Sequence, residues 1–65
     1  MSEGLKAVKE YIYEVYTSSG NRIVIKGVTN VLVDYQNCNV IFLDREGNHI
    51  GNFMLDNIEG WRVAP

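Results

Sequence analysis

Cysteine and histidine are the side chains that most readily do chemistry near neutral pH, and this chain has one of each, Cys38 and His49. A thiolate becomes a nucleophile when a neighbouring base takes its proton, so these two could form a dyad only within hydrogen-bond reach. A turn or core cysteine near a strand-start histidine is the more ordinary arrangement, because cysteine commonly behaves as a small buried hydrophobe. We therefore predict that the chain is not an enzyme.

The remaining polar residues indicate neither a catalytic pair nor a cofactor. The acidic side chains near predicted turns are Asp34, Asp44, Glu46 and Asp56. Aspartate at a turn usually accepts hydrogen bonds from its own backbone, which favours a structural role. The glycines form no phosphate-binding motif, and one cysteine with one histidine falls short of the four ligands of a structural zinc site. We expect neither a metal nor a cofactor.

Tyrosine and arginine are the residue types that favour binding. Tyr and Trp bury a large area at small entropic cost, and Arg can pair with carboxylate or phosphate. Phe42, Phe53 and Trp61 are expected to fill the core. Tyr13 and Tyr16 lie on opposite faces of one predicted strand, so at least one of those faces meets solvent, a ligand or a partner. The predicted binding residues are Tyr11, Tyr13, Tyr16, Tyr35, Arg22, Arg45 and Arg62.

A period of two in the apolar residues predicts strands along most of the chain. Residues 11–16 and 22–26 read as a hairpin around the turn Ser18 to Asn21, and Gly27 marks a bulge or bend before residues 28–33. We expect one strongly bent strand there, or two. Residues 40–43 and 49–55 form a second hairpin around Gly47, after a turn whose asparagines can adopt left-handed conformations.

The end of the chain completes the predicted fold. Residues 56–60 predict a 3₁₀ turn and residues 61–63 a short closing strand. This order is typical of a small SH3-like barrel with about five antiparallel strands, so we predict a mostly β fold. An open sheet packed against a second copy is the alternative. Residues 1–10 form an N-terminal segment, disordered or a short helix, and residues 11–65 form the single domain.

Size and charge set limits on partners and compartment. A 65-residue domain buries only about 60% of its unfolded surface and usually needs additional support. Because disulfide and metal are not available, self-association is expected. A lone cysteine, with no signal peptide or membrane span in the sequence, predicts a cytoplasmic protein. The net charge of −2 disfavours general nucleic-acid binding, which needs a basic surface.

The stretch from Val40 to Trp61 consists of a strand, an acidic glycine turn, a second strand and a late tryptophan. It resembles small β proteins encoded by bacteriophages and prophages. The resemblance implies a protein of the host cytoplasm that binds a host factor, a defence component or a signalling nucleotide. It assigns no functional residue.

Three classes of binding function are consistent with these features. The first is a homo-oligomeric module that binds a host or defence protein, as a phage-type inhibitor or regulator does. The second is a binder or sponge for a small molecule such as a cyclic nucleotide, held between subunits by tyrosine stacking and arginine. The third is a single-stranded nucleic-acid binder, or a structural component of a larger particle.

Overall fold

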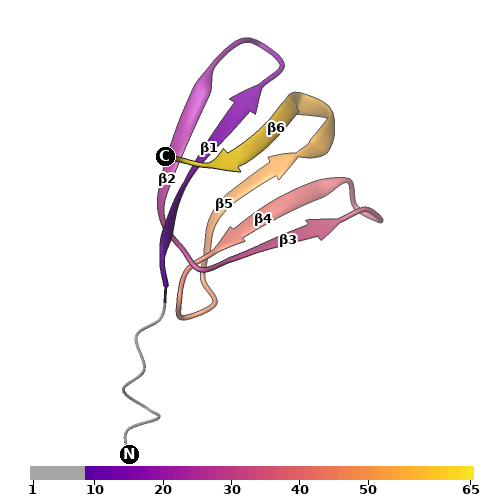
Figure 1. Ribbon diagram of the computed structural model, residues 1–65. Coiled ribbons are helices and arrows are strands. Elements are labelled where there is room, and N and C mark those ends of the chain that lie inside the picture. The colour runs from indigo at the N-terminus through magenta and orange to yellow at the C-terminus, as the bar shows by residue number, and fades with distance from the viewer. Residues whose placement is uncertain (1–8) are drawn as a thin grey trace, which may run out of the picture.

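The computed structural model describes residues 9–65, which form six strands and one 3₁₀ turn (Figure 1). The elements are β1 (Tyr11–Thr17), β2 (Arg22–Val28), β3 (Asn30–Asp34), β4 (Asn39–Leu43), β5 (His49–Met54), η2 (Leu55–Asn57) and β6 (Ile58–Val63). The prediction of a mostly β fold with a 3₁₀ turn before the last strand is therefore confirmed. The structure has six strands where about five were predicted, and β6 begins at Ile58, within the segment predicted to lie outside a strand. Most of the segment predicted at residues 1–10 lies outside the described residues.

The strands pair into two antiparallel, three-stranded sheets. One sheet has the order β2-β1-β6 and the other has the order β3-β4-β5. Only Thr29 separates β2 from β3, so the bent segment predicted after Gly27 is divided between the two sheets. Among residues 9–65 no strand pairing joins one sheet to the other, and hydrogen bonding therefore does not close them into a continuous barrel.

Glycines allow the chain to turn where the sequence predicts it. Gly20 has φ 93° in the turn between β1 and β2, and Gly47 has φ 84° in the turn between β4 and β5. These left-handed values are costly for residues with a Cβ atom. In the second turn, Asp44 Oδ1 accepts hydrogen bonds from the backbone N–H of Glu46 at 2.9 Å and of Asn48 at 2.8 Å. Both predicted hairpins are confirmed.

Gly27 lies in a β-bulge at the end of β2. Tyr11 pairs with Val28 and Tyr13 pairs with Ile25, so two residues of β2 face one residue of β1. The φ of Gly27 is 77°, a value that a glycine adopts without strain. The predicted bulge is confirmed, and the chain leaves the first sheet directly after it.

The turn between β3 and β4 differs from the prediction in one residue. Asn37 and Asn39 were the expected left-handed positions, but Cys38 adopts this conformation, with φ 57°. Asp34 accounts for the arrangement, because its Oδ2 atom accepts a hydrogen bond at 2.8 Å from the side-chain amide of Asn37. That bond holds Asn37 within the turn, and the chain takes its left-handed conformation at the next residue, Cys38.

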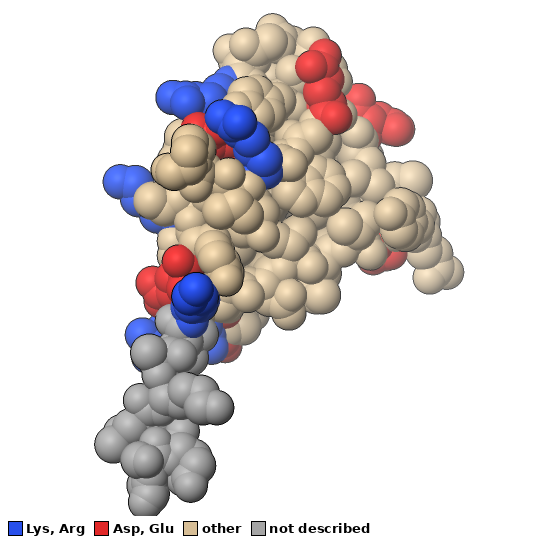
Figure 2. All heavy atoms as spheres, in the orientation of Figure 1, with Lys and Arg blue, Asp and Glu red and all other residues tan. Residues whose placement is uncertain are grey.

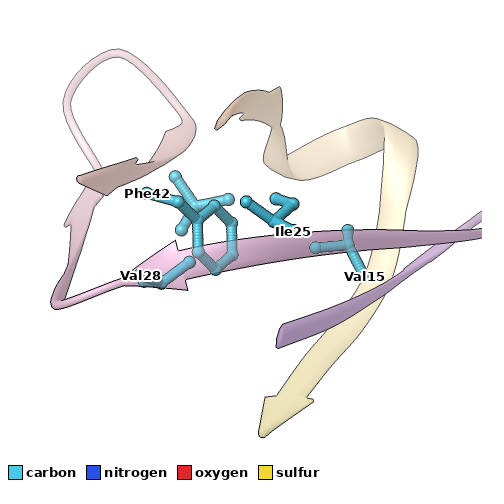
Figure 3. Close-up of a cluster of buried hydrophobic side chains, with 5 residues drawn as sticks. Val15, Ile25, Val28 and Phe42 are labelled. Carbon is cyan, nitrogen blue, oxygen red and sulfur yellow. The ribbon is translucent and has the colours of Figure 1, made fainter. Parts of the chain in front are cut away.

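The core lies between the two sheets and consists of small aliphatic side chains around one phenylalanine (Figure 3). Its buried members are Val15, Ile25, Val28, Val40 and Phe42. The rings of Tyr13, Phe53 and Trp61 surround Phe42 edge-on, with centroid distances of 5.4, 5.9 and 6.3 Å. Edge-to-face contacts are a favourable geometry for aromatic pairs. The core role predicted for Phe42, Phe53 and Trp61 is confirmed.

Candidate functional site

Cys38 and His49 do not form the dyad that their chemistry would allow. Cys38 lies in the turn before β4, whereas His49 pairs with Leu43 at the other end of that strand. A strand rises about 3.3 Å per residue, so the two side chains are separated by roughly 16 Å. Neither residue has the other as a base or nucleophile. Cys38 is an exposed turn cysteine and not the buried core residue that its type suggested, and His49 begins β5 as predicted.

The predicted tyrosines are distributed over different parts of the molecule. Tyr13 packs against the core, and its ring contacts Phe42. Tyr35 lies at the turn between β3 and β4 and is 80% exposed. Tyr11 is partly exposed at the start of β1. Tyr16 lies on the opposite face of β1 from Tyr13, where its hydroxyl donates a 2.7 Å hydrogen bond to Glu14 Oε1.

Glu14 is the centre of a charged cluster on the outer face of the β2-β1-β6 sheet. Arg22 Nη1 donates a 2.9 Å hydrogen bond to Glu14 Oε2, and Arg62 Nε donates a 2.9 Å hydrogen bond to Glu14 Oε1. Together with the bond from Tyr16, these contacts engage both carboxylate oxygens. We call Glu14, Tyr16, Arg22 and Arg62 the arginine clip.

The strand register explains why these side chains meet. Glu14 pairs with Arg62 across β1 and β6, and Tyr16 pairs with Arg22 across β1 and β2. Residues directly opposite in antiparallel strands share a face, as do residues two apart on one strand. The middle strand therefore contributes the acid, and each flanking strand contributes one arginine.

Burial and charge make the carboxylate the fixed part of the arginine clip. The Glu14 side chain is 8% exposed, whereas those of Arg22 and Arg62 are 58% and 59% exposed. The hydrogen bond from Tyr16, followed by the hydrogen bond from Arg62, holds the pKa of Glu14 below its usual range. The same pairing raises the pKa of Arg62. Glu14 is therefore a carboxylate at neutral pH.

The two guanidinium groups keep donors available for another molecule. An arginine has five N–H donors, and Arg22 and Arg62 each direct one of them to Glu14. Two positive charges beside one negative charge leave a local charge of about +1. Figure 2 shows basic side chains gathered over β1 and β2, with an acidic group partly covered between them. The surface can therefore accept an anionic group.

Apolar side chains lie beside the arginine clip on the same face. Ile12 is two residues from Glu14 on β1, and Val24 pairs with Glu14 across β1 and β2. They are 43% and 45% exposed. An exposed combination of arginine, tyrosine and aliphatic side chains is typical of the surfaces that bind other proteins.

Of the three predicted arginines, Arg45 is not part of the arginine clip. It lies in the turn between β4 and β5, with Nη1 at 3.8 Å from Glu10 Oε2. Glu14 is the member that the sequence analysis missed. The signal available was a lone acidic residue in the middle of an aromatic strand, four residues before a predicted hairpin turn that brings Arg22 across from Tyr16.

Residues 9–65 contain no group of three or more His, Cys, Asp or Glu side chains placed to hold a metal ion. Within this range the surface forms no pocket. None of its helices has the length and hydrophobicity that a membrane crossing requires. Comparison of the chain with protein-family models, with curated proteins and with solved structures finds no match.

Proposed function

We propose that this chain is a non-enzymatic binding protein whose outer β2-β1-β6 face engages an acidic group of a partner protein. The observation that carries the proposal is the arginine clip, in which a buried carboxylate positions two largely exposed guanidinium groups. Fixing an arginine in advance reduces the side-chain entropy that binding would otherwise cost. Glu14 is thus a positioning residue, and Arg22 and Arg62 are the binding residues.

A protein surface fits this face better than a free small molecule does. Ile12 and Val24 flank the charged groups on a sheet face, so an acidic side chain and its apolar neighbours could contact both kinds of residue. A carboxylate accepts two parallel N–H donors from a guanidinium group, which adds geometric specificity to the attraction. A partner surface with aspartate or glutamate beside aliphatic side chains is the expected complement.

A phosphate group is the second candidate for the same donors. Guanidinium groups bind phosphate with the same paired geometry, which keeps a cyclic nucleotide among the proposed ligands. Small-molecule sites usually bury most of the ligand within a concave surface. A nucleotide on this sheet face would therefore need a second subunit to cover it, as proposed for a homo-oligomer.

The partner class follows from the resemblance of residues 40–61 to phage-encoded β proteins. Under this proposal the partner is a host or defence protein, and the chain acts in the host cytoplasm as an inhibitor or regulator. The proposed fold type is an incompletely closed SH3-like barrel. It is supported by the strand orders β2-β1-β6 and β3-β4-β5, the bend at Thr29 between β2 and β3, and the 3₁₀ turn before β6.

Affinity capture with matched variants tests the proposed function. The immobilised full chain is compared with the variants Arg62→Gln and Arg45→Gln, which lose the same charge at different places. We expect a bacterial partner retained by the wild type and by R45Q, and reduced at least about tenfold by R62Q, because a charge-assisted bond contributes roughly 1.5–3 kcal/mol. Equal retention by all three chains, or no stoichiometric partner, would contradict the proposal.

A further inference from the structure

β3 differs from the other strands at the sheet edges. The edge strands of the described sheets are β2, β6, β3 and β5, and each has a strand partner on one side only. The pairings of β2, β6 and β5 are each interrupted by a bulge or irregularity, whereas β3 pairs with β4 without any shift in register. Bulges discourage pairing with other chains, so β3 is the least protected of these four edges.

The composition of β3 adds to this difference. Residues 30–34 read Asn-Val-Leu-Val-Asp and include no lysine, arginine, proline or glycine. β2 contains Arg22 and Lys26, and β6 contains Glu59 and Arg62. Charged residues and proline are common protective devices on edge strands. The one charged residue of β3, Asp34, lies at the end of the strand, where its carboxylate accepts hydrogen bonds from the following turn. Alternate residues of β3 direct backbone N–H and C=O groups away from β4, where they are open to a second strand. The N–H of Val31 already donates a 2.9 Å hydrogen bond to Asn30 Oδ1, so this side chain has to turn aside before a second strand can pair there.

We propose that β3 pairs antiparallel with β3 of a second copy of this chain, so that two three-stranded sheets become one six-stranded sheet. In the register centred on Leu32, Leu32 lies opposite Leu32 of the second copy. Asn30 then lies opposite Asp34, and Val31 lies opposite Val33. No like charges face each other, and every pair combines residues of compatible size and polarity.

Burial of apolar side chains favours a second copy of the chain as the partner of β3. Leu32 is 47% exposed on the outer face, and the leucine of a second copy would cover part of it. Val31 and Val33 pack against the margin of the core, so pairing would extend the apolar layer across the dimer. The fully buried core of the described residues is small, with Val15, Val28, Val40 and Phe42 as its largest fully buried side chains. Additional apolar burial in a dimer would therefore stabilise the fold.

Light scattering of the full chain, from low to high micromolar concentration, tests the proposal. The wild type should approach twice the chain mass of 7.4 kDa as concentration rises. Leu32→Lys places two like charges opposite each other and should weaken association by at least about tenfold. Met54→Lys is the matched control, since Met54 is 54% exposed on β5, the other edge of the same sheet, and should leave association unchanged.

A cysteine cross-link tests the register independently of stability. In a Cys38→Ser background, Leu32→Cys should give a covalent dimer on mild oxidation and Met54→Cys should not, because opposite residues of paired strands approach disulfide distance. Three results would overturn the proposal. They are a strict monomer at every concentration, a dimer equally weakened by L32K and M54K, and a monomer whose β3 edge amides are protected by another part of the same chain.

Discussion

At the scale of single residues, the arginine clip makes the contribution of the buried Glu14 to folding stability depend on pH. Folding lowers the pKa of Glu14, chiefly through the hydrogen bonds from Tyr16 and Arg62. The unfolded chain therefore takes up this proton at a higher pH than the folded chain does. The stabilisation is fully present above the ordinary pKa of glutamate and is lost as pH falls through the lowered value.

Replacing Glu14 with glutamine tests whether the Glu14 carboxylate stabilises the fold. We expect Glu14→Gln to be less stable than the wild type at pH 7, because Arg22 and Arg62 lose their shared counter-charge. The difference should shrink as the pH falls, since the wild-type carboxylate becomes neutral. Urea unfolding at a series of pH values measures both effects. Glu59→Gln, an exposed change on β6, is the control.

The Glu14→Gln variant should still lose some stability as the pH falls. Hydrogen bonds within their turns also lower the pKa of Asp34, mainly from the Asn37 side chain, and of Asp44, mainly from the Asn48 backbone. Both turns should therefore weaken at low pH in either chain. Equal stability of the wild type and Glu14→Gln across the whole pH range would show that the arginine clip does not stabilise the fold.

At the scale of elements, β5 of one sheet contacts β2 of the other. A Cβ atom added to Gly51 would lie 2.7 Å from Ile25 Cδ1, well inside van der Waals contact. An alanine methyl group would therefore displace the end of the Ile25 side chain, and Phe53 Cε2 at 3.3 Å and Phe42 Cδ1 at 3.4 Å leave the methyl group little room on its other sides. Packing of this kind depends on two strands distant in the chain, and neither the spacing of Gly51 nor that of Ile25 predicts it.

Alanine at position 51 tests this contact. We expect Gly51→Ala to cost about 1–3 kcal/mol of stability through overpacking, measured by chemical unfolding. Ile25→Val removes the methyl group that clashes, so the double variant should lose less than the sum of the two single changes. Gly60→Ala, where no atom lies within 4 Å of the added Cβ, is the control and should be nearly neutral. Strict additivity of the Gly51 and Ile25 changes would contradict the packing described.

Local elements were predictable from the sequence, whereas contacts between distant strands were not. The turns at Gly20 and Gly47 depend on residues that are neighbours in the chain, and their positions follow from composition. The hydrogen bond between Arg62 and Glu14 joins residues 48 apart and requires β6 to pair with β1. Arg22 and Arg62 were predicted as binding residues, but the acid that positions them depends on strand order. Strand order is fixed by the packing of the whole chain.

At the scale of the whole molecule, charge is unevenly distributed in an acidic chain. The net charge is −2, yet the β2-β1-β6 sheet carries three basic residues, Arg22, Lys26 and Arg62, against two acidic residues, Glu14 and Glu59. Ile12 and Val24 are exposed on the same sheet. An acidic partner would be attracted to this face while the rest of the surface repels it. The proposed β3 pairing uses the edge of the other sheet, so self-association and partner binding would occupy different parts of the molecule.

The central claim is that Arg22 and Arg62 bind an acidic group while Glu14 holds them in place. The most direct measurement follows the arginine Nε–Hε signals by NMR while a short glutamate peptide, or inorganic phosphate, is added. The account predicts saturable shifts at Arg22 and Arg62, larger with the glutamate peptide, no shift at Arg45, and loss of the Arg22 response in Arg62→Gln. Equal, non-saturating shifts at all three arginines, or none, would contradict it.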